Sequence, residues 1–166
     1  MNTLSIMYPY EYASNLVNLS WCDIREAIEK GFMLPQAAIE HAISKLVEEN
    51  NPIQLIDLAC SEKNDYIQPY INYLSDLESN VIKEQVNDKL LYILLNWVHE
   101  NREKYSDVLE VIEIIYSDFD YPDKISKFVR YMPMSQPDLG SSELNTQRLL
   151  TNWEEYLSDQ KDMFAE

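Results

Sequence analysis

The chain has 166 residues, 46% of them hydrophobic, and its 29 acidic side chains outnumber 13 basic ones, for a formal net charge of −16. Because it keeps the aliphatic and aromatic residues that disordered chains of high charge lack, we expect a folded core. The charge disfavours direct binding to nucleic acid or to an anionic membrane, since both need a basic surface. It favours a basic protein partner, although a role in solubility alone explains it equally well.

The start of the chain indicates no export signal. Residues 1–7 contain no basic side chain and no apolar run of signal-peptide length, and the longest apolar run, 90–95, is far shorter than the roughly 20 residues that cross a bilayer. Cys22 and Cys60 are too few for a disulfide framework and lack CxxC spacing. We expect both to be buried thiols in a cytoplasmic protein.

The first predicted elements form a helical hairpin. Ser20 and Asp23 have the spacing of a capping box, and Gly31 after Lys30 suits a C-cap, so a helix is expected between them. Pro35 suits the first turn of the next helix. The apolar stripe of that second helix would consist of Ala38, Ile39, Ala42, Ile43 and Leu46.

The rest of the chain also shows helical signals. Helices are expected at 52–60, 64–77, 81–100, 106–119, 122–131 and from Ser142 onward. The 81–100 helix should be central, because residues 90–98 are apolar on almost every side. Prolines and a glycine predict a loop over 133–141.

These elements predict an all-α fold of seven or eight short antiparallel helices stacked as hairpins. The arrangement would resemble an irregular α-solenoid, but no self-similar period marks a true repeat. Period-2 alternation is considered only for residues 3–7. We expect one domain over 1–166 with a docked last helix, because Trp153, Tyr156 and Leu157 need burial.

The amino-terminal block Tyr8-Pro9-Tyr10-Glu11-Tyr12 leaves two interpretations open. It is either an exposed arm that binds a partner or a strap packed over the helices, and packing is the favoured alternative.

No motif indicates catalysis, a cofactor or a metal. Ala38 and Asn96 stand where a di-iron Glu-x-x-His motif needs glutamate before His41 and His99. We assign both histidines structural or surface roles, with His41 beside the apolar stripe. Two isolated glycines cannot form a phosphate-binding loop. The sequence therefore favours a protein that is not an enzyme.

An acidic ridge is the candidate interaction site. Between Asp107 and Asp123 no Lys or Arg occurs, and the helical step places four acids opposite the apolar arc of that helix. Interleaved tyrosines favour an interface that could mimic a nucleic-acid backbone, while a merely solvated helix face stays open as the alternative. The candidate partner-binding residues are Asp107, Glu110, Glu113, Tyr116, Asp118, Asp120, Tyr121 and Asp123.

Several blocks resemble a small bacterial family of helical proteins of unknown function. They are LSWCDI at 19–24, AIEKG at 27–31, PQAAIEHA at 35–42, RYMP at 130–133 and the closing helix with Trp153. The resemblance implies a link to immunity proteins encoded beside polymorphic toxins, notably LXG-type toxins of Gram-positive bacteria, whose C-terminal domains are often nucleases. It supplies no binding residues.

We therefore expect a cytoplasmic immunity protein, or antitoxin, that neutralises a basic toxin domain of the nuclease class by occlusion. The alternative is a helical adaptor that binds peptides in the groove of a stacked-hairpin array. A third interpretation, an enzyme with a carboxylate-bound metal, is the least favoured.

Overall fold

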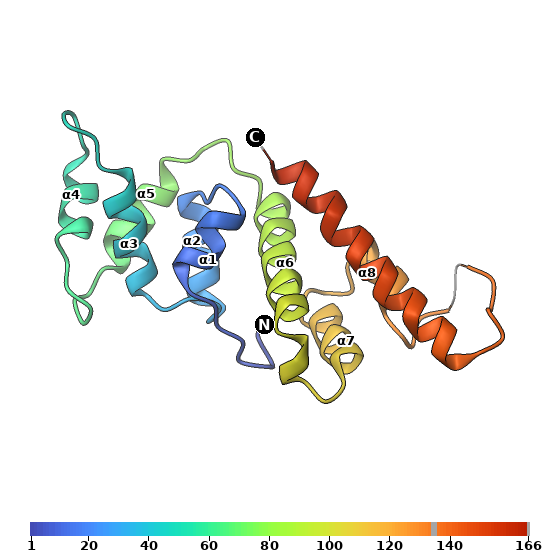
Figure 1. Ribbon diagram of the computed structural model, residues 1–166. Coiled ribbons are helices and arrows are strands. Elements are labelled where there is room, and N and C mark those ends of the chain that lie inside the picture. Colours follow the sequence, from blue (N-terminus) through green and yellow to red (C-terminus); the bar gives the residue numbers. More distant parts are fainter. Residues whose placement is uncertain (134–135, 166) are drawn as a thin grey trace. The chain divides into compact units, whose positions relative to one another are not determined.

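The computed structural model describes residues 1–133 and 136–165 (Figure 1). These residues form helices and connecting segments, and no strand occurs among them, which confirms the predicted all-α class. The α-helices are α1 (Tyr10–Leu16), α2 (Trp21–Glu29), α3 (Gln36–Lys45), α4 (Ile53–Ala59), α5 (Gln68–Asp76), α6 (Lys83–Glu100), α7 (Val108–Asp118) and α8 (Ser142–Phe164). Two 3-10 helices are η1 (Arg102–Lys104) and η2 (Asp123–Phe128).

The chain forms two compact units. The N-terminal unit is Ser5–Leu90, and the C-terminal unit combines Met1–Leu4 with Leu91–Glu166, so the division falls within α6. The single domain over 1–166 stays a prediction.

Stacked hairpins build the N-terminal unit. Helices α3 and α4 lie side by side and are joined by the 46–52 loop (Figure 1). Helix α5 packs on α2 and α4, and α3 also contacts α1 and α2. Large fully buried side chains of this unit include Ile24, Phe32, Leu58 and Ile71.

Both predicted caps of α2 are formed. The Ser20 hydroxyl accepts from the Asp23 N–H at 3.1 Å, and the Asp23 carboxylate accepts from the Ser20 N–H at 2.8 Å, which completes the capping box. At the other end Gly31 has a φ of 80°. The Phe32 N–H then reaches back to the Ala27 carbonyl at 2.9 Å, the pattern of a Schellman cap.

Long-range polar contacts fix the start of α2. Asp23 is 1% exposed, and its carboxylate lies 2.8 Å from the Lys89 ammonium. Glu78, beyond the end of α5, accepts from the backbone N–H groups of Trp21 and Cys22 at 2.9 and 2.8 Å. A glutamate distant in sequence thus accepts hydrogen bonds from backbone N–H groups of the first turn, which have no acceptor within the helix.

The amino-terminal tyrosine block is packed, so the exposed arm is wrong. Tyr8 is 3% exposed, and its ring stacks on Phe32 with centroids 6.0 Å apart. The block continues into α1, a helix that the sequence analysis did not predict, with Pro9 in extended conformation as its N-cap. Residues 3–7 form no strand.

The buried face of helix α3 overlaps the predicted stripe only in part, at Ala38 and Ala42. Ile43 and Leu46, expected in the core, are 56% and 41% exposed. Since the spacing of packed helices depends on the side chains between them, a face rich in alanine lets the neighbouring helices approach more closely than isoleucine would. The buried residues are Ala37, Ala38, His41 and Ala42.

His41 therefore lies inside the core rather than beside it. Its Nδ1 is 2.7 Å from the Tyr10 hydroxyl, and its ring meets Trp21 edge to face at 4.7 Å. Burial, with a smaller contribution from Lys45, lowers the pKa of His41 to about 4. The imidazole is neutral at physiological pH.

The C-terminal unit is built around the second half of α6. Residues 91–95 and Val98 are at most 2% exposed, which confirms the prediction of a central helix. Helix α8 packs on η2, where Trp153 is fully buried. The Trp153 ring stacks on Phe128 at 6.4 Å and meets His99 edge to face at 4.8 Å.

The predicted helix over 122–131 is instead the shorter 3-10 helix η2. Its buried side chains are Ile125 and Phe128, three residues apart, and this spacing returns to one face in a helix with three residues per turn. Residues 136–141 of the predicted 133–141 loop contain no helix, and 134–135 lie outside the described residues.

The cysteines are not the buried thiols that we expected. Cys60 is exposed at the end of α4, and Cys22 is half-buried. Among the described helices, none is long and apolar enough to cross a bilayer.

Candidate partner-binding surface on α7

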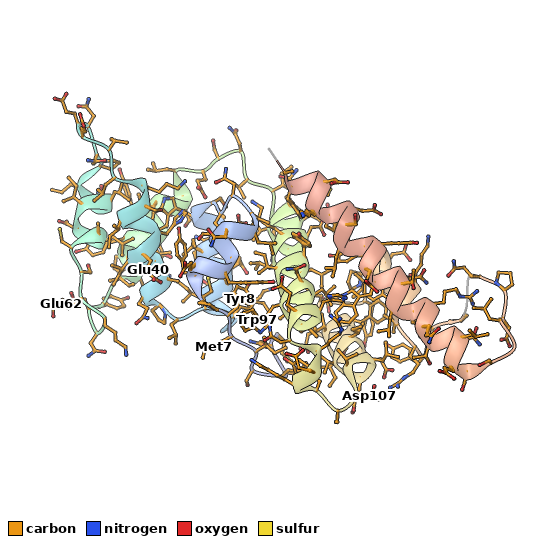
Figure 2. All side chains as sticks on the ribbon, viewed as in Figure 1. Met7, Tyr8, Glu40, Glu62, Trp97 and Asp107 are labelled. Atoms are coloured by element: carbon orange, nitrogen blue, oxygen red, sulfur yellow. The ribbon has the colours of Figure 1, made fainter. Side chains whose placement is uncertain are left out.

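Most of the predicted acidic ridge lies on helix α7, whose apolar arc is buried. Asp107 is its N-cap, and the Asp107 side chain accepts from the Glu110 N–H at 3.3 Å (Figure 2). The arc that fixes the helix is Leu109, Val111, Ile112, Ile115 and Tyr116, all buried.

Arg130, which lies after η2, partly neutralises this ridge. Its guanidinium donates to both carboxylate oxygens of Asp107, at 3.1 and 3.3 Å, and its Nε donates to Glu113 at 2.9 Å. The Arg130 hydrogen bond lowers the pKa of the Asp107 carboxyl. Two of the predicted contact acids are thus paired within the protein.

The amino terminus is tied to the same helix. The Thr3 N–H and hydroxyl donate to the Asp118 carboxylate at 2.9 and 2.6 Å. Asp118 therefore has a structural partner, and the segment Met1–Leu4 is held beside the last turn of α7.

The end of α7 has an unusual backbone. Asp120 and Tyr121 both have a φ of 58°, in the left-handed region where a glycine is usual. Their N–H groups donate to the carbonyls of Ser117 and Tyr116 at 3.1 and 2.8 Å, so the cap is a Schellman motif without glycine. Tyr121 leaves this turn 59% exposed.

Three tyrosines come together at this end of α7. Tyr116 is only 5% exposed, so its ring is not available as a partner anchor. It instead supports two exposed rings, Tyr121 at 5.3 Å edge to face and Tyr131 at 6.1 Å. The Tyr116 hydroxyl donates to the Met132 sulfur at 3.9 Å.

The exposed rings border a hollow of about 380 Å³, here called the tyrosine hollow. A tyrosine phenol is neutral at physiological pH, and partial desolvation, followed by the neighbouring tyrosines and Glu113, raises the pKa of Tyr131 further. Aromatic faces beside carboxylates attract a cationic side chain through the ring quadrupole as well as by charge. The lining residues are Thr3, Glu113, Ile114, Ser117, Asp118, Tyr121 and Tyr131.

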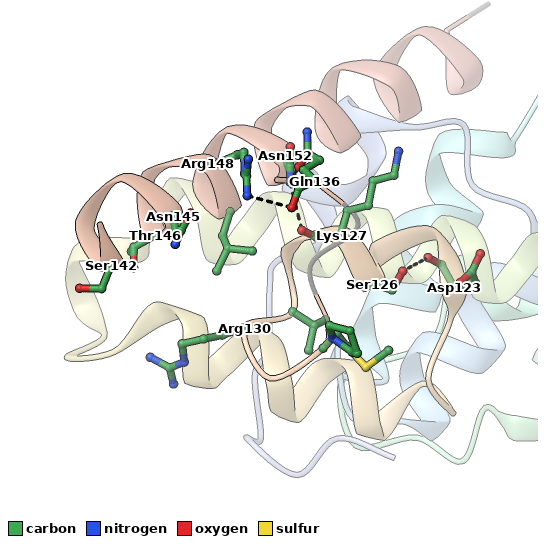
Figure 3. Close-up of a pocket in the computed structure, with 14 residues that line it drawn as sticks. Asp123, Ser126, Lys127, Arg130, Gln136, Ser142, Asn145, Thr146, Arg148 and Asn152 are labelled. Atoms are coloured by element: carbon green, nitrogen blue, oxygen red, sulfur yellow. Dashed lines mark hydrogen bonds between the residues drawn. The ribbon is translucent and has the colours of Figure 1, made fainter. Parts of the chain in front are cut away.

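A larger cavity of about 700 Å³ lies between η2 and α8 (Figure 3). Asp123 lines this cavity rather than the tyrosine hollow. The Asn152 amide donates to the Lys127 carbonyl and the Gln136 side chain at 3.1 and 3.0 Å. Arg130 also lines the cavity, with its guanidinium bonded to the acids of α7.

The structure thus gathers only part of the predicted set. Glu113, Asp118 and Tyr121 line the tyrosine hollow, while Glu110 and Asp120 are exposed. Tyr131 and Arg130 were not among the residues predicted for this surface, and their place in the RYMP block was the only signal in the sequence. Among the described residues, no group of three or more His, Cys, Asp or Glu side chains could hold a metal ion.

Comparison with known proteins gives one family. The model of a family described as an uncharacterized protein conserved in bacteria (DUF2247) matches residues 10–161. No curated protein and no solved structure matches the chain.

Proposed function

The chain belongs to this bacterial family, and we propose that it is a cytoplasmic immunity protein that neutralises a basic toxin domain of the nuclease class by binding it. The observation that carries the proposal is the tyrosine hollow, in which two exposed rings stand beside carboxylates. Such a site suits a lysine or arginine side chain of a protein partner.

The mechanism is stoichiometric occlusion. A net charge of −16 attracts a basic domain from a distance and can raise the association rate by about 10- to 1000-fold. Tyr121 and Tyr131 then supply contact area at small entropy cost, because a tyrosine has few rotatable bonds. A toxin whose basic, nucleic-acid-binding face is covered in this way cannot reach its substrate.

The proposal revises the roles of the predicted residues. Glu110 and Asp120 are exposed carboxylates suited to steering, and Tyr121 is an anchor. The buried Tyr116 ring packs against the Tyr121 and Tyr131 rings and positions them. Arg130 holds Asp107 and Glu113 in place through its hydrogen bonds.

Charge reversal tests the steering role. Glu110→Lys should slow association with the toxin domain several-fold and weaken its salt dependence, because a charge on the rim acts mainly on the association rate. Glu155→Lys, on an exposed position of α8, changes the net charge equally and serves as the control. Equal effects of the two variants would mean that only the total charge matters.

Truncation of a ring tests the anchor. Tyr121→Ala should speed dissociation roughly tenfold, since aromatic anchors carry much of the binding energy of an interface. Tyr66→Ala removes an 80% exposed ring of the other unit and should leave dissociation unchanged. A Tyr121→Ala protein that binds and protects like wild type would remove the tyrosine hollow from the interface.

The peptide-binding adaptor is the second candidate, and the larger cavity between η2 and α8 favours it. Its volume of about 700 Å³ is in the range of small-ligand and side-chain pockets. The effect of salt on binding distinguishes the two functions. Association steered by acidic residues should slow as the ionic strength rises, whereas binding in this cavity, which Val129 and Leu149 line together with Lys127 and Arg148, should depend less on salt.

A further inference from the structure

The tip of the α3–α4 hairpin exposes a set of aliphatic side chains that the core does not use. Val47 and Ile53 are 62% and 66% exposed, and Ile43 is 56% exposed. Leu46 and Ile56 are each 41% exposed. Single exposed aliphatic residues need no explanation, but a contiguous set of them marks an interaction site.

The fold makes these residues neighbours. The Asn51 side chain closes the loop by accepting from the Val47 N–H at 2.9 Å and donating to the Val47 carbonyl at 2.7 Å. Val47 is thereby held beside the start of α4, where Ile53 and Ile56 are one helical turn apart. Ile43 is in the last turn of α3, which lies alongside α4 (Figure 1), and Val47 follows just after the end of that helix. We call these five residues (Ile43, Leu46, Val47, Ile53 and Ile56) the hairpin patch.

Acidic side chains surround the hairpin patch. Glu48 and Glu49 follow Val47 in the loop, and Asp57 follows Ile56. Glu40, which is labelled in Figure 2, precedes Ile43 by one turn. All four are exposed, and Lys45 is the only Lys or Arg between residues 40 and 57. A second copy of the chain would bring two such acidic rims together, and an anionic lipid surface would be repelled.

We propose that the hairpin patch docks an amphipathic helix of a partner protein, with an aliphatic stripe flanked by lysine or arginine. The stripe would lie against Ile43, Val47 and Ile53, and the flanking cations would meet the acidic rim. A helix that presents apolar residues at positions i, i+3, i+4 and i+7 is the recurring ligand of such a surface. The site is in the N-terminal unit and does not depend on the partner proposed for α7.

Synthetic peptides of about 18 residues, or five helical turns, test this inference. The probe contains leucine and lysine with the leucines on one helical face. One control has the same composition with leucines scattered around the helix, and a second has glutamate in place of lysine. Methyl NMR spectra of the full chain should show shifts at Ile43, Val47 and Ile53 with the probe, and each control peptide should bind about tenfold more weakly or less.

A matched pair of variants locates the contact. The double variant Val47→Ser, Ile53→Ser should weaken binding of the leucine–lysine probe about tenfold or more, since it removes two apolar contacts. Its control is Leu77→Ser, Ile82→Ser, which changes residues of the same unit that are 58% and 55% exposed. Because all four side chains are exposed, both variants should remain folded.

Any one of four results would overturn the inference. Equal binding of the probe and the scattered peptide, or equal effects of the two double variants, would mean that the charge of the chain attracts any cationic peptide. Equal binding of the glutamate peptide would contradict the role of the acidic rim. A dimer in analytical ultracentrifugation that Val47→Ser, Ile53→Ser dissociates would make a second copy the occupant.

Discussion

The ion pair of buried Asp23 with half-buried Lys89 makes the N-terminal unit sensitive to the loss of one carboxylate. Asp23→Ala removes the acceptor of the Ser20 N–H at 2.8 Å and the partner of the Lys89 ammonium at 2.8 Å. Loss of the Asp23 contribution to the capping box should lower the free energy of unfolding by about 1 kcal/mol. A buried polar group that loses its partner should lower it by about 1–3 kcal/mol. The Lys89 side chain is 20% exposed, and its ammonium keeps a hydrogen bond to the Asn18 carbonyl at 3.0 Å. We therefore expect a total loss of about 2–4 kcal/mol in the free energy of unfolding.

Urea denaturation of a small set of variants measures this loss. Asp23→Asn keeps an acceptor for Ser20 but loses the charge, so it should cost less than Asp23→Ala. Lys89→Met leaves the Asp23 charge buried and unpaired and should cost more than the double variant Asp23→Asn, Lys89→Met, which carries neither charge. A cost below about 0.5 kcal/mol for Asp23→Ala, or strictly additive costs of the single variants, would refute this reasoning.

Three further changes should have measurable effects. Burial lowers the pKa of His41 from 6.5 to about 4, so the unfolded state takes up a proton at a higher pH than the folded state. As the pH falls from 6.5 toward 4, the free energy of unfolding should therefore decrease, by on the order of 2 kcal/mol at pH 5. Denaturation curves of His41→Phe should lack this pH-dependent contribution. Asp120→Gly should stabilise the chain by about 0.5–1 kcal/mol and raise the Tm by about 2 °C, because glycine adopts the φ of 58° without strain. A lower Tm would contradict the assigned cap. Trp153→Ala should lower the free energy of unfolding by about 3–5 kcal/mol because it leaves a cavity. Leu144→Ala, at a 48% exposed position of the same helix, should lower it little, and similar losses for the two variants would mean that α8 is not held through Trp153.

Features determined by near neighbours in sequence were predictable from the chain. The capping box of Ser20 and Asp23 and the Gly31 cap depend on residues within one or two turns of each other, and both are formed. The apolar run of α6 likewise identified a buried helix. By contrast, α1 was missed because Pro9 and the tyrosines offered no side-chain cap.

Features determined by distant residues could not be predicted in this way. The burial of His41 depends on Tyr10 and Trp21, which belong to other helices. The partners of the acids on α7, Thr3 and Arg130, come from outside the helix as well. The sequence pattern of α7 therefore could not predict these two partners.

Tyr116 is a different case, since its burial left a local signal. It follows Ile112 by four residues and Leu109 by seven, which places it on the apolar arc of α7 rather than among the acids. Tyr131 left no comparable signal, because its position against Tyr116 depends on the turn after η2.

The most direct test of the proposed function is a calorimetric titration of the full chain with a basic toxin domain of the nuclease class, the partner that we propose for it. Occlusion through the tyrosine hollow predicts a one-to-one complex whose affinity falls as salt rises and falls again with Tyr121→Ala, but not with Tyr66→Ala. Absence of binding at low salt, or a complex that neither salt nor Tyr121→Ala weakens, would contradict it.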